Sequence, residues 1–179
     1  MATAYDATLE VLKNSLVNPH HLNFVAKLSS NVTFSPKAGR VVRLNASGEF
    51  EMGLPNTVGA AHMPIFLWSG AADTDVSNPS STSGPGEWAA ALPDGYLVGL
   101  VAVGAWELET TEYDSAQSYN PGDALTATPN NTDSATGGRL TKATAYGAPI
   151  CGVVSRGVHK NARGKNVLSF WPVWLPRQA

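Results

Sequence analysis

The sequence predicts an all-β protein, a barrel or sandwich of short antiparallel strands with long loops and a short N-terminal helix or arm. Charged residues make up only 15% of the 179 residues, which is less than long, solvated helices would carry. Glycine and proline are frequent, with 17 and 12 copies. Roughly ten short apolar or alternating runs, separated by turn residues, follow one another every 8 to 15 residues, a spacing typical of all-β domains.

The N-terminal segment has a different pattern from the rest. Its apolar residues recur at helical spacing and end at Asn18-Pro19, which stops a helix. We therefore expect residues 1–40 to form a helix or arm and a first strand, and residues 41–179 to form the β domain. The apolar positions are Tyr5, Leu9, Leu12 and Leu16.

Three stretches of the β domain lead to specific expectations. Residues 63–68 are continuously apolar, which predicts a strand buried on both faces. Residues 106–113 alternate, with Glu107 and Glu109 on one face, which we expect to be solvated. Residues 69–93 are rich in Gly, Ser, Pro and Asp and predict a long loop that a partner orders, with Trp88 as the residue that pins it.

Charge is segregated along the chain. Residues 1–43 carry a net charge of +3, residues 44–138 carry −12 with no Lys or Arg, and residues 139–179 carry +7 with no acid. Two interpretations remain open. The blocks neutralise each other within one subunit, or a basic face meets an acidic face of a neighbouring copy or of another protein.

No residue pattern indicates an enzyme, a cofactor site or a metal centre. Phosphate-binding glycine turns and nucleophile elbows are missing, and no set of Cys and His has ligand spacing. Cys151 lies in an apolar strand and is expected to be an inert thiol. The basic C-terminal block contains aromatic residues, but they read as a core strand, so a nucleic-acid partner is not expected. No apolar run is long enough to span a membrane, and no signal peptide is expected.

Several phrases together resemble the capsid decoration, or cement, proteins of tailed bacteriophages. A Pro-Gly-Asp turn leads into a strand, and a Gly-x-Leu-Thr hairpin and a Gly-Val-Val strand follow. The resemblance covers about the last two-thirds of the chain. The phrases are residues 63–68 (MPIFLW), 119–126 (YNPGDALT), 138–141 (GRLT), 150–157 (ICGVVSRG) and 168–176 (LSFWPVWLP).

This resemblance implies a structural virion protein, made in the host bacterial cytoplasm, that binds the outer surface of the major capsid shell and stabilises it. Its partners would be the major capsid protein and neighbouring copies of itself. The alternative is a carbohydrate- or receptor-binding module of a phage tail or fibre, which an exposed cluster of Trp88 and Trp106 would favour. The candidate interface residues are Arg156, Lys160, Arg163, Lys165, Trp88, Glu107 and Glu109.

Overall fold

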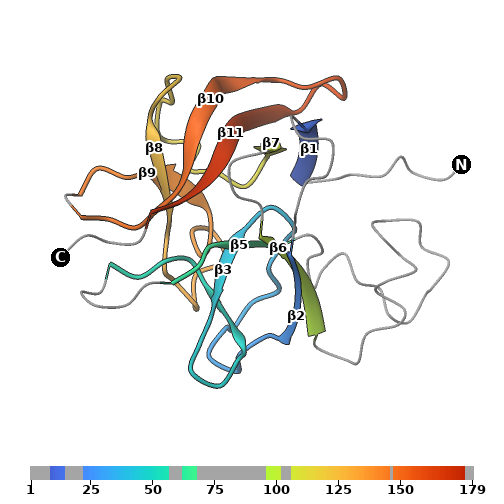
Figure 1. Cartoon of the computed structure of the whole chain (residues 1–179), viewed down its shortest axis with the longest axis vertical. Coiled ribbons are helices and arrows are strands. Elements are labelled where there is room, and N and C mark those ends of the chain that lie inside the picture. The colour runs from blue at the N-terminus through green and yellow to red at the C-terminus, as the bar shows by residue number, and fades with distance from the viewer. Residues whose placement is uncertain are drawn as a thin grey trace, which may run out of the picture.

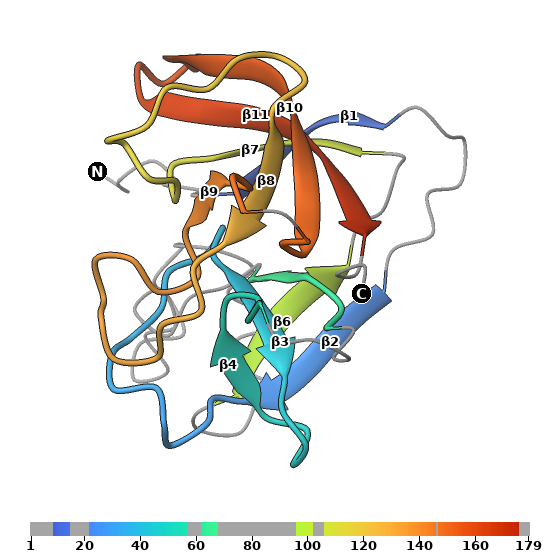
Figure 2. The same cartoon turned by 90° about the vertical axis from the view of Figure 1, so that its left-hand side faces the viewer.

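Two antiparallel sheets make up the described part of the chain, in agreement with the predicted all-β class. The computed structural model describes residues 9–14, 22–56, 62–67, 96–101, 106–145 and 147–175. In Figures 1 and 2 the six-stranded sheet occupies the upper half of the molecule and the five-stranded sheet the lower half.

The six-stranded sheet has the order β1-β7-β11-β10-β8-β9, and every neighbouring pair is antiparallel. Its longest strands form the β10–β11 hairpin, which lies along the top of the molecule (Figure 1). The strands are β1 (Leu9–Asn14), β7 (Trp106–Thr110), β8 (Ala124–Ala127), β9 (Leu140–Lys142), β10 (Ile150–Lys160) and β11 (Asn166–Leu175).

The five-stranded sheet has the order β2-β6-β5-β3-β4 and is also antiparallel throughout. It contains strands from the first third of the chain together with β6. The strands are β2 (Leu22–Lys27), β3 (Val41–Leu44), β4 (Phe50–Met52), β5 (Ile65–Leu67) and β6 (Tyr96–Val101).

Each sheet curls until distant strands meet. Leu28, directly after β2, forms a bridge with Phe50 of β4, which joins the two ends of the five-stranded sheet. Tyr113, shortly after β7, forms a bridge with Leu140 of β9 in the same way. The bridges give both sheets a barrel-like curvature. In the six-stranded sheet the bridge closes a ring that runs from β7 through β11, β10 and β8 to β9, and β1 is an additional strand outside this ring.

The predicted N-terminal helix is wrong. Residues 9–14 form β1, which pairs with β7 from Leu9 opposite Thr110 to Asn14 opposite Trp106. The short segment gains backbone hydrogen bonds from a neighbouring strand, and this pairing overrides its helical spacing. The described residues before position 41 therefore contribute β1 to the six-stranded sheet and β2 to the five-stranded sheet.

The hydrophobic core lies on both faces of β3 and β5. Phe66 points toward the six-stranded sheet, where its ring centroid is 5.4 Å from that of Phe170. Ile65 and Leu67 point to the opposite face and pack in a second cluster with Phe50 and Met52. All three residues of β5 are fully buried, which confirms the strand buried on both faces that the apolar run predicted.

Candidate functional site

The β10–β11 hairpin carries most of the candidate interface residues that the structure describes. Its two strands are the longest in the protein's described part, and the turn between them consists only of residues 161–165. The side-chain Oδ1 of Asn161 accepts hydrogen bonds from the backbone N–H groups of Arg163 and Lys165, each 3.0 Å long. Gly164 has a φ of +75°, a conformation that favours glycine. These contacts give the turn a defined shape.

The second half of β10 presents positive charge to solvent. Burial alternates along the second half of β10, so that Arg156, Val158 and Lys160 are exposed while their neighbours are half-buried. We call these three residues the cationic strip. A polar hairpin tip between two apolar strands predicts that its four cations, Arg156, Lys160, Arg163 and Lys165, are exposed. Arg163 in the turn is exposed, whereas the prediction is wrong for Lys165, which is half-buried.

Residues next to those of the strip connect the hairpin to β7. Asn161 Nδ2 donates a 3.2 Å hydrogen bond to Glu109 Oε1, and His159 Nε2 lies 4.0 Å from Glu109 Oε2. Ser155 Oγ donates a 2.7 Å hydrogen bond to Glu107 Oε1. Both carboxylates are buried, with 7% of Glu107 and 4% of Glu109 exposed.

The expected solvated acidic face on β7 is therefore wrong. The alternation of residues 106–110 is real, but polar groups of the hairpin cover the face that carries Glu107 and Glu109. A buried carboxylate needs donors, and the hairpin supplies them from residues about fifty positions away in the chain. The two acids hold the hairpin in place from within the protein.

Gly157, within the strip's strand, packs closely against the backbone of Tyr119. A Cβ atom at this position would lie 2.5 Å from the backbone oxygen of Tyr119, so a larger residue does not fit without movement of the backbone. Tyr119 is itself anchored, because its hydroxyl donates to the backbone oxygens of Asp114 and Leu140 at 3.0 and 3.3 Å. Burial, together with the charge of Asp114, raises the pKa of Tyr119, so the hydroxyl remains a donor.

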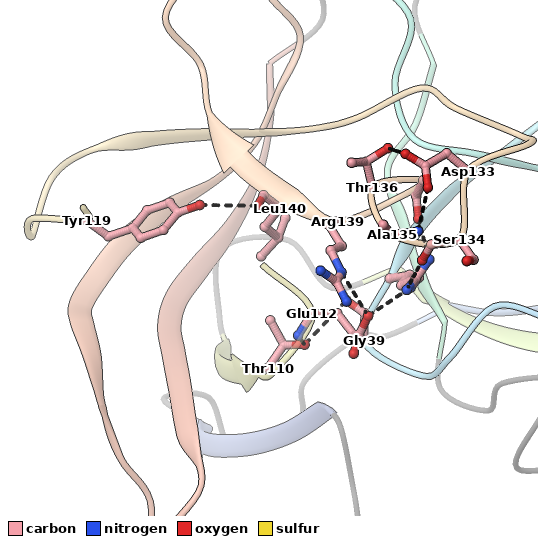
Figure 3. A network of polar contacts seen from close by, with 12 residues as sticks. Gly39, Thr110, Glu112, Tyr119, Asp133, Ser134, Ala135, Thr136, Arg139 and Leu140 are labelled. Carbon is pink, nitrogen blue, oxygen red and sulfur yellow. Dashed lines mark hydrogen bonds and ion pairs between the residues drawn. The ribbon is translucent and has the colours of Figure 1, made fainter. Parts of the chain in front are cut away.

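A second polar cluster lies at the junction of the two sheets (Figure 3). Arg40 is buried and donates from Nε to Glu112 Oε2 at 2.8 Å, and Arg139 Nε lies 3.4 Å from the same oxygen. Arg40 also donates to the backbone oxygens of Gly137 and Ser134 at 3.0 and 2.7 Å. The cluster ties the loop before β9 to the residue that precedes β3.

Two more ion pairs neutralise charge within the subunit. Arg43 pairs with Glu51, and Lys142 Nζ lies 2.9 Å from Asp123 Oδ2. Every acid whose side chain the structure describes is buried or half-buried and accepts a hydrogen bond from its own chain. These acids are Glu49, Glu51, Glu107, Glu109, Glu112, Asp114, Asp123 and Asp133.

Neutralisation within the subunit thus accounts for the basic residues at the sheet junction and in β3 and β9. It does not extend to the cationic strip. Within the described ranges, no acidic side chain lies within ion-pair distance of Arg156 or Lys160. Among the residues that the structure describes, the two cations of the strip on this braced hairpin therefore have no compensating acid.

The remaining candidates have different outcomes. Cys151 is fully buried, as expected for an inert thiol, and burial raises its pKa to about 12. Trp88, the loop 69–93 and the side chain of Trp106 lie outside what the structure describes. In the described ranges, no group of three or more His, Cys, Asp or Glu side chains is placed to hold a metal ion.

Comparisons with known proteins found no relative of this chain. No protein-family model, no curated protein and no solved structure matches the chain. No helix among the described residues has the length and apolar character needed to cross a membrane.

The sequence interpretation overlooked the residues that support the hairpin. Asn161 precedes Gly164 by three positions, which is a turn signal, but its bond to Glu109 is a tertiary contact without a local pattern. The same holds for Arg40 and Glu112, which are 72 residues apart. The low proportion of charged residues, 15%, was the only indication in the sequence that many of them form ion pairs and hydrogen bonds within the subunit.

Proposed function

We propose that the protein is a structural virion protein that decorates the outer surface of a tailed-phage capsid shell and stabilises it. The observation that carries the proposal is the cationic strip, which lies on a braced hairpin and whose two cations have no acidic partner among the described residues. Such a strip suits attachment to an acidic protein surface. The phrases that resemble cement proteins include the first half of this hairpin, residues 150–157, and most of β11.

The arrangement of the other charges also supports a docking role. Where basic residues serve the fold, they lie next to carboxylates, as Arg40 does with Glu112 at 2.8 Å. Exposed charges without partners contribute little to folding stability, so the strip has no evident role in holding this fold together. Attachment to another surface gives these residues a role.

Deletion of the gene tests the proposal. Phage heads that lack the protein should assemble but lose their DNA at lower temperature than wild-type heads, because the shell has lost an external brace. Purified protein added to these heads should restore the wild-type release temperature, and buffer alone should not. Heads of unchanged robustness would refute the decoration role.

The alternative, a carbohydrate- or receptor-binding module of a tail or fibre, has one observation in its favour. Trp174 near the end of β11 is 39% exposed, and an exposed indole can stack on a sugar ring. If this role is right, the Trp174→Ala variant should lose binding to host cells, while heads that lack the protein should remain robust.

A further inference from the structure

A row of polar residues crosses β1, β7 and β11 on one face of the six-stranded sheet. Glu109 of β7 lies opposite Glu10 of β1 on one side and opposite Ser169 of β11 on the other. Residues directly opposite each other in an antiparallel pair share a face of the sheet, with Cβ atoms about 4.5 to 5.5 Å apart. Leu108 and Phe170, which alternate with members of the row, pack in the core. The row therefore lies on the face that is turned away from this core.

Glu109 is the buried carboxylate at the centre of the row, with only 4% of the residue exposed. Its Oε1 accepts the hydrogen bond from Asn161, and its Oε2 lies 4.0 Å from Nε2 of His159. A second acid, Glu10, occupies the register position directly opposite. Like charges in opposite positions repel each other, and burial weakens the screening of this repulsion by water. The row therefore requires positive charge.

His159 presents a lone pair to this carboxylate. Its Nδ1 lies 2.9 Å from the backbone oxygen of Gly157. Because a carbonyl oxygen only accepts hydrogen bonds, Nδ1 carries the proton, and Nε2 of the neutral ring is an acceptor. Two acceptors, His159 Nε2 and Glu109 Oε2, then face each other across 4.0 Å. This contact is favourable only with a proton or a metal ion between the two atoms. Histidines that bind metals commonly donate their other N–H group to a backbone carbonyl in this way.

Ser169 provides an independent indication of a ligand. The residue is 1% exposed, and its Oγ has no hydrogen-bond partner. Buried hydroxyl groups almost always have a partner, so an orphaned one requires an explanation. A cation held by Glu109, the residue directly opposite, would provide that partner.

The charge of the row favours a divalent metal ion over a proton. A proton on His159 adds one positive charge to two carboxylates, whereas a divalent ion adds two and leaves the ring neutral. The neighbouring basic residues do not fill this role, because Lys13 lies opposite Glu107 in the next row. Arg156, opposite Ser169, is exposed and has no described carboxylate within ion-pair distance. An imidazole nitrogen with carboxylate oxygens is a typical donor set for zinc.

We propose that Glu109 Oε2 and His159 Nε2, together with Glu10, bind a zinc ion, and that Ser169 Oγ lies beside it. The two described donor atoms are 4.0 Å apart, and small side-chain rotations bring them to the separation of about 3.4 Å that a tetrahedral zinc ion requires. The ligands come from β7, β10 and β1. The metal would therefore fasten the N-terminal strand, which lies outside the closed ring, to the β10–β11 hairpin.

Calorimetric titration of the EDTA-treated full chain with zinc chloride tests the proposal. Wild type should bind one zinc ion per chain with micromolar affinity or tighter. Glu10→Gln and His159→Gln should each weaken binding at least about tenfold, because each removes a ligand. The matched control is His62→Gln, a half-buried histidine outside the row, which should bind like wild type. Circular dichroism of each variant verifies that the β-sheet content is retained.

Hydrogen exchange shows whether the bound metal fastens β1. Zinc should slow the exchange of the backbone amides of residues 9–14 in wild type and leave it unchanged in Glu10→Gln. Absence of zinc binding by wild type would overturn the proposal. Unchanged binding by Glu10→Gln and His159→Gln would also overturn it, because the zinc would then bind elsewhere, for example at His20 and His21. Zinc binding without slower exchange in β1 would contradict the assignment of Glu10 as a ligand.

Discussion

Asn161 at the turn of the β10–β11 hairpin and Glu109 in β7 are 52 residues apart in the chain and are joined by a hydrogen bond of 3.2 Å. The Asn161 side chain thereby has two roles, because its oxygen shapes the turn while its amide group ties the turn to a buried carboxylate. The shape of the exposed cationic strip depends on a contact that is hidden beneath it.

Substitution of Asn161 tests this support. Asn161→Ala removes the acceptor for two backbone N–H groups and one donor to Glu109, and should lower the free energy of unfolding by about 1 to 2 kcal/mol. Backbone amides of residues 161–166 should exchange faster with deuterium. Asn166→Ala, an exposed substitution on the opposite strand of the hairpin, serves as the control and should leave exchange in the turn unchanged.

The buried ion pair at the sheet junction should be a large contributor to stability. Glu112→Gln leaves the buried guanidinium of Arg40 without its carboxylate and should lower the free energy of unfolding by about 3 kcal/mol, as measured by urea titration. Glu49→Gln, at a half-buried position outside this cluster, should cost less than about 0.5 kcal/mol. Equal losses for the two variants would contradict the importance assigned to the cluster.

Stability should depend on pH through Glu51. The hydrogen bond from Asn31, together with the charge of Arg43, holds the pKa of Glu51 below its usual value. A carboxylate with a lowered pKa in the folded state stabilises the protein above its unfolded pKa of about 4.3, and this contribution disappears as the pH falls through the folded pKa. Glu51→Gln should therefore be less stable than wild type at pH 7, and the difference should shrink on acidification.

The Cys151 thiol should be unreactive in the native protein. It is fully buried, and its pKa is raised to about 12, so the thiolate is scarce at pH 8. A disulfide reagent such as dithionitrobenzoate should label the protein only after concentrated guanidinium chloride is added. Rapid labelling without denaturant would show that β10 opens readily.

Local sequence patterns were sufficient for elements whose environment follows from their own residues. The continuous apolar run around Phe66 predicted burial on both faces, and the structure confirms it. Local patterns were not sufficient for the N-terminal segment, because the positions of Leu9 and Leu12 fit a helix as well as a strand. Pairing with β7 decides between the two.

The candidate site was predictable only in part. The exposure of Arg156 and Lys160 followed from a polar stretch between two apolar strands. The burial of Glu107 and Glu109 did not, because alternation shows that two faces differ but not what covers each of them. Donors such as Ser155 reach these acids through tertiary folding.

Electron cryomicroscopy of intact heads tests the decoration role most directly. Maps of wild-type heads and of heads that lack the gene product should differ by density on the outer surface of the shell. This density should fit the two-sheet body, with the β10–β11 hairpin against the capsid protein. Identical outer surfaces in the two maps, or the extra density on the tail instead of the head, would contradict the account.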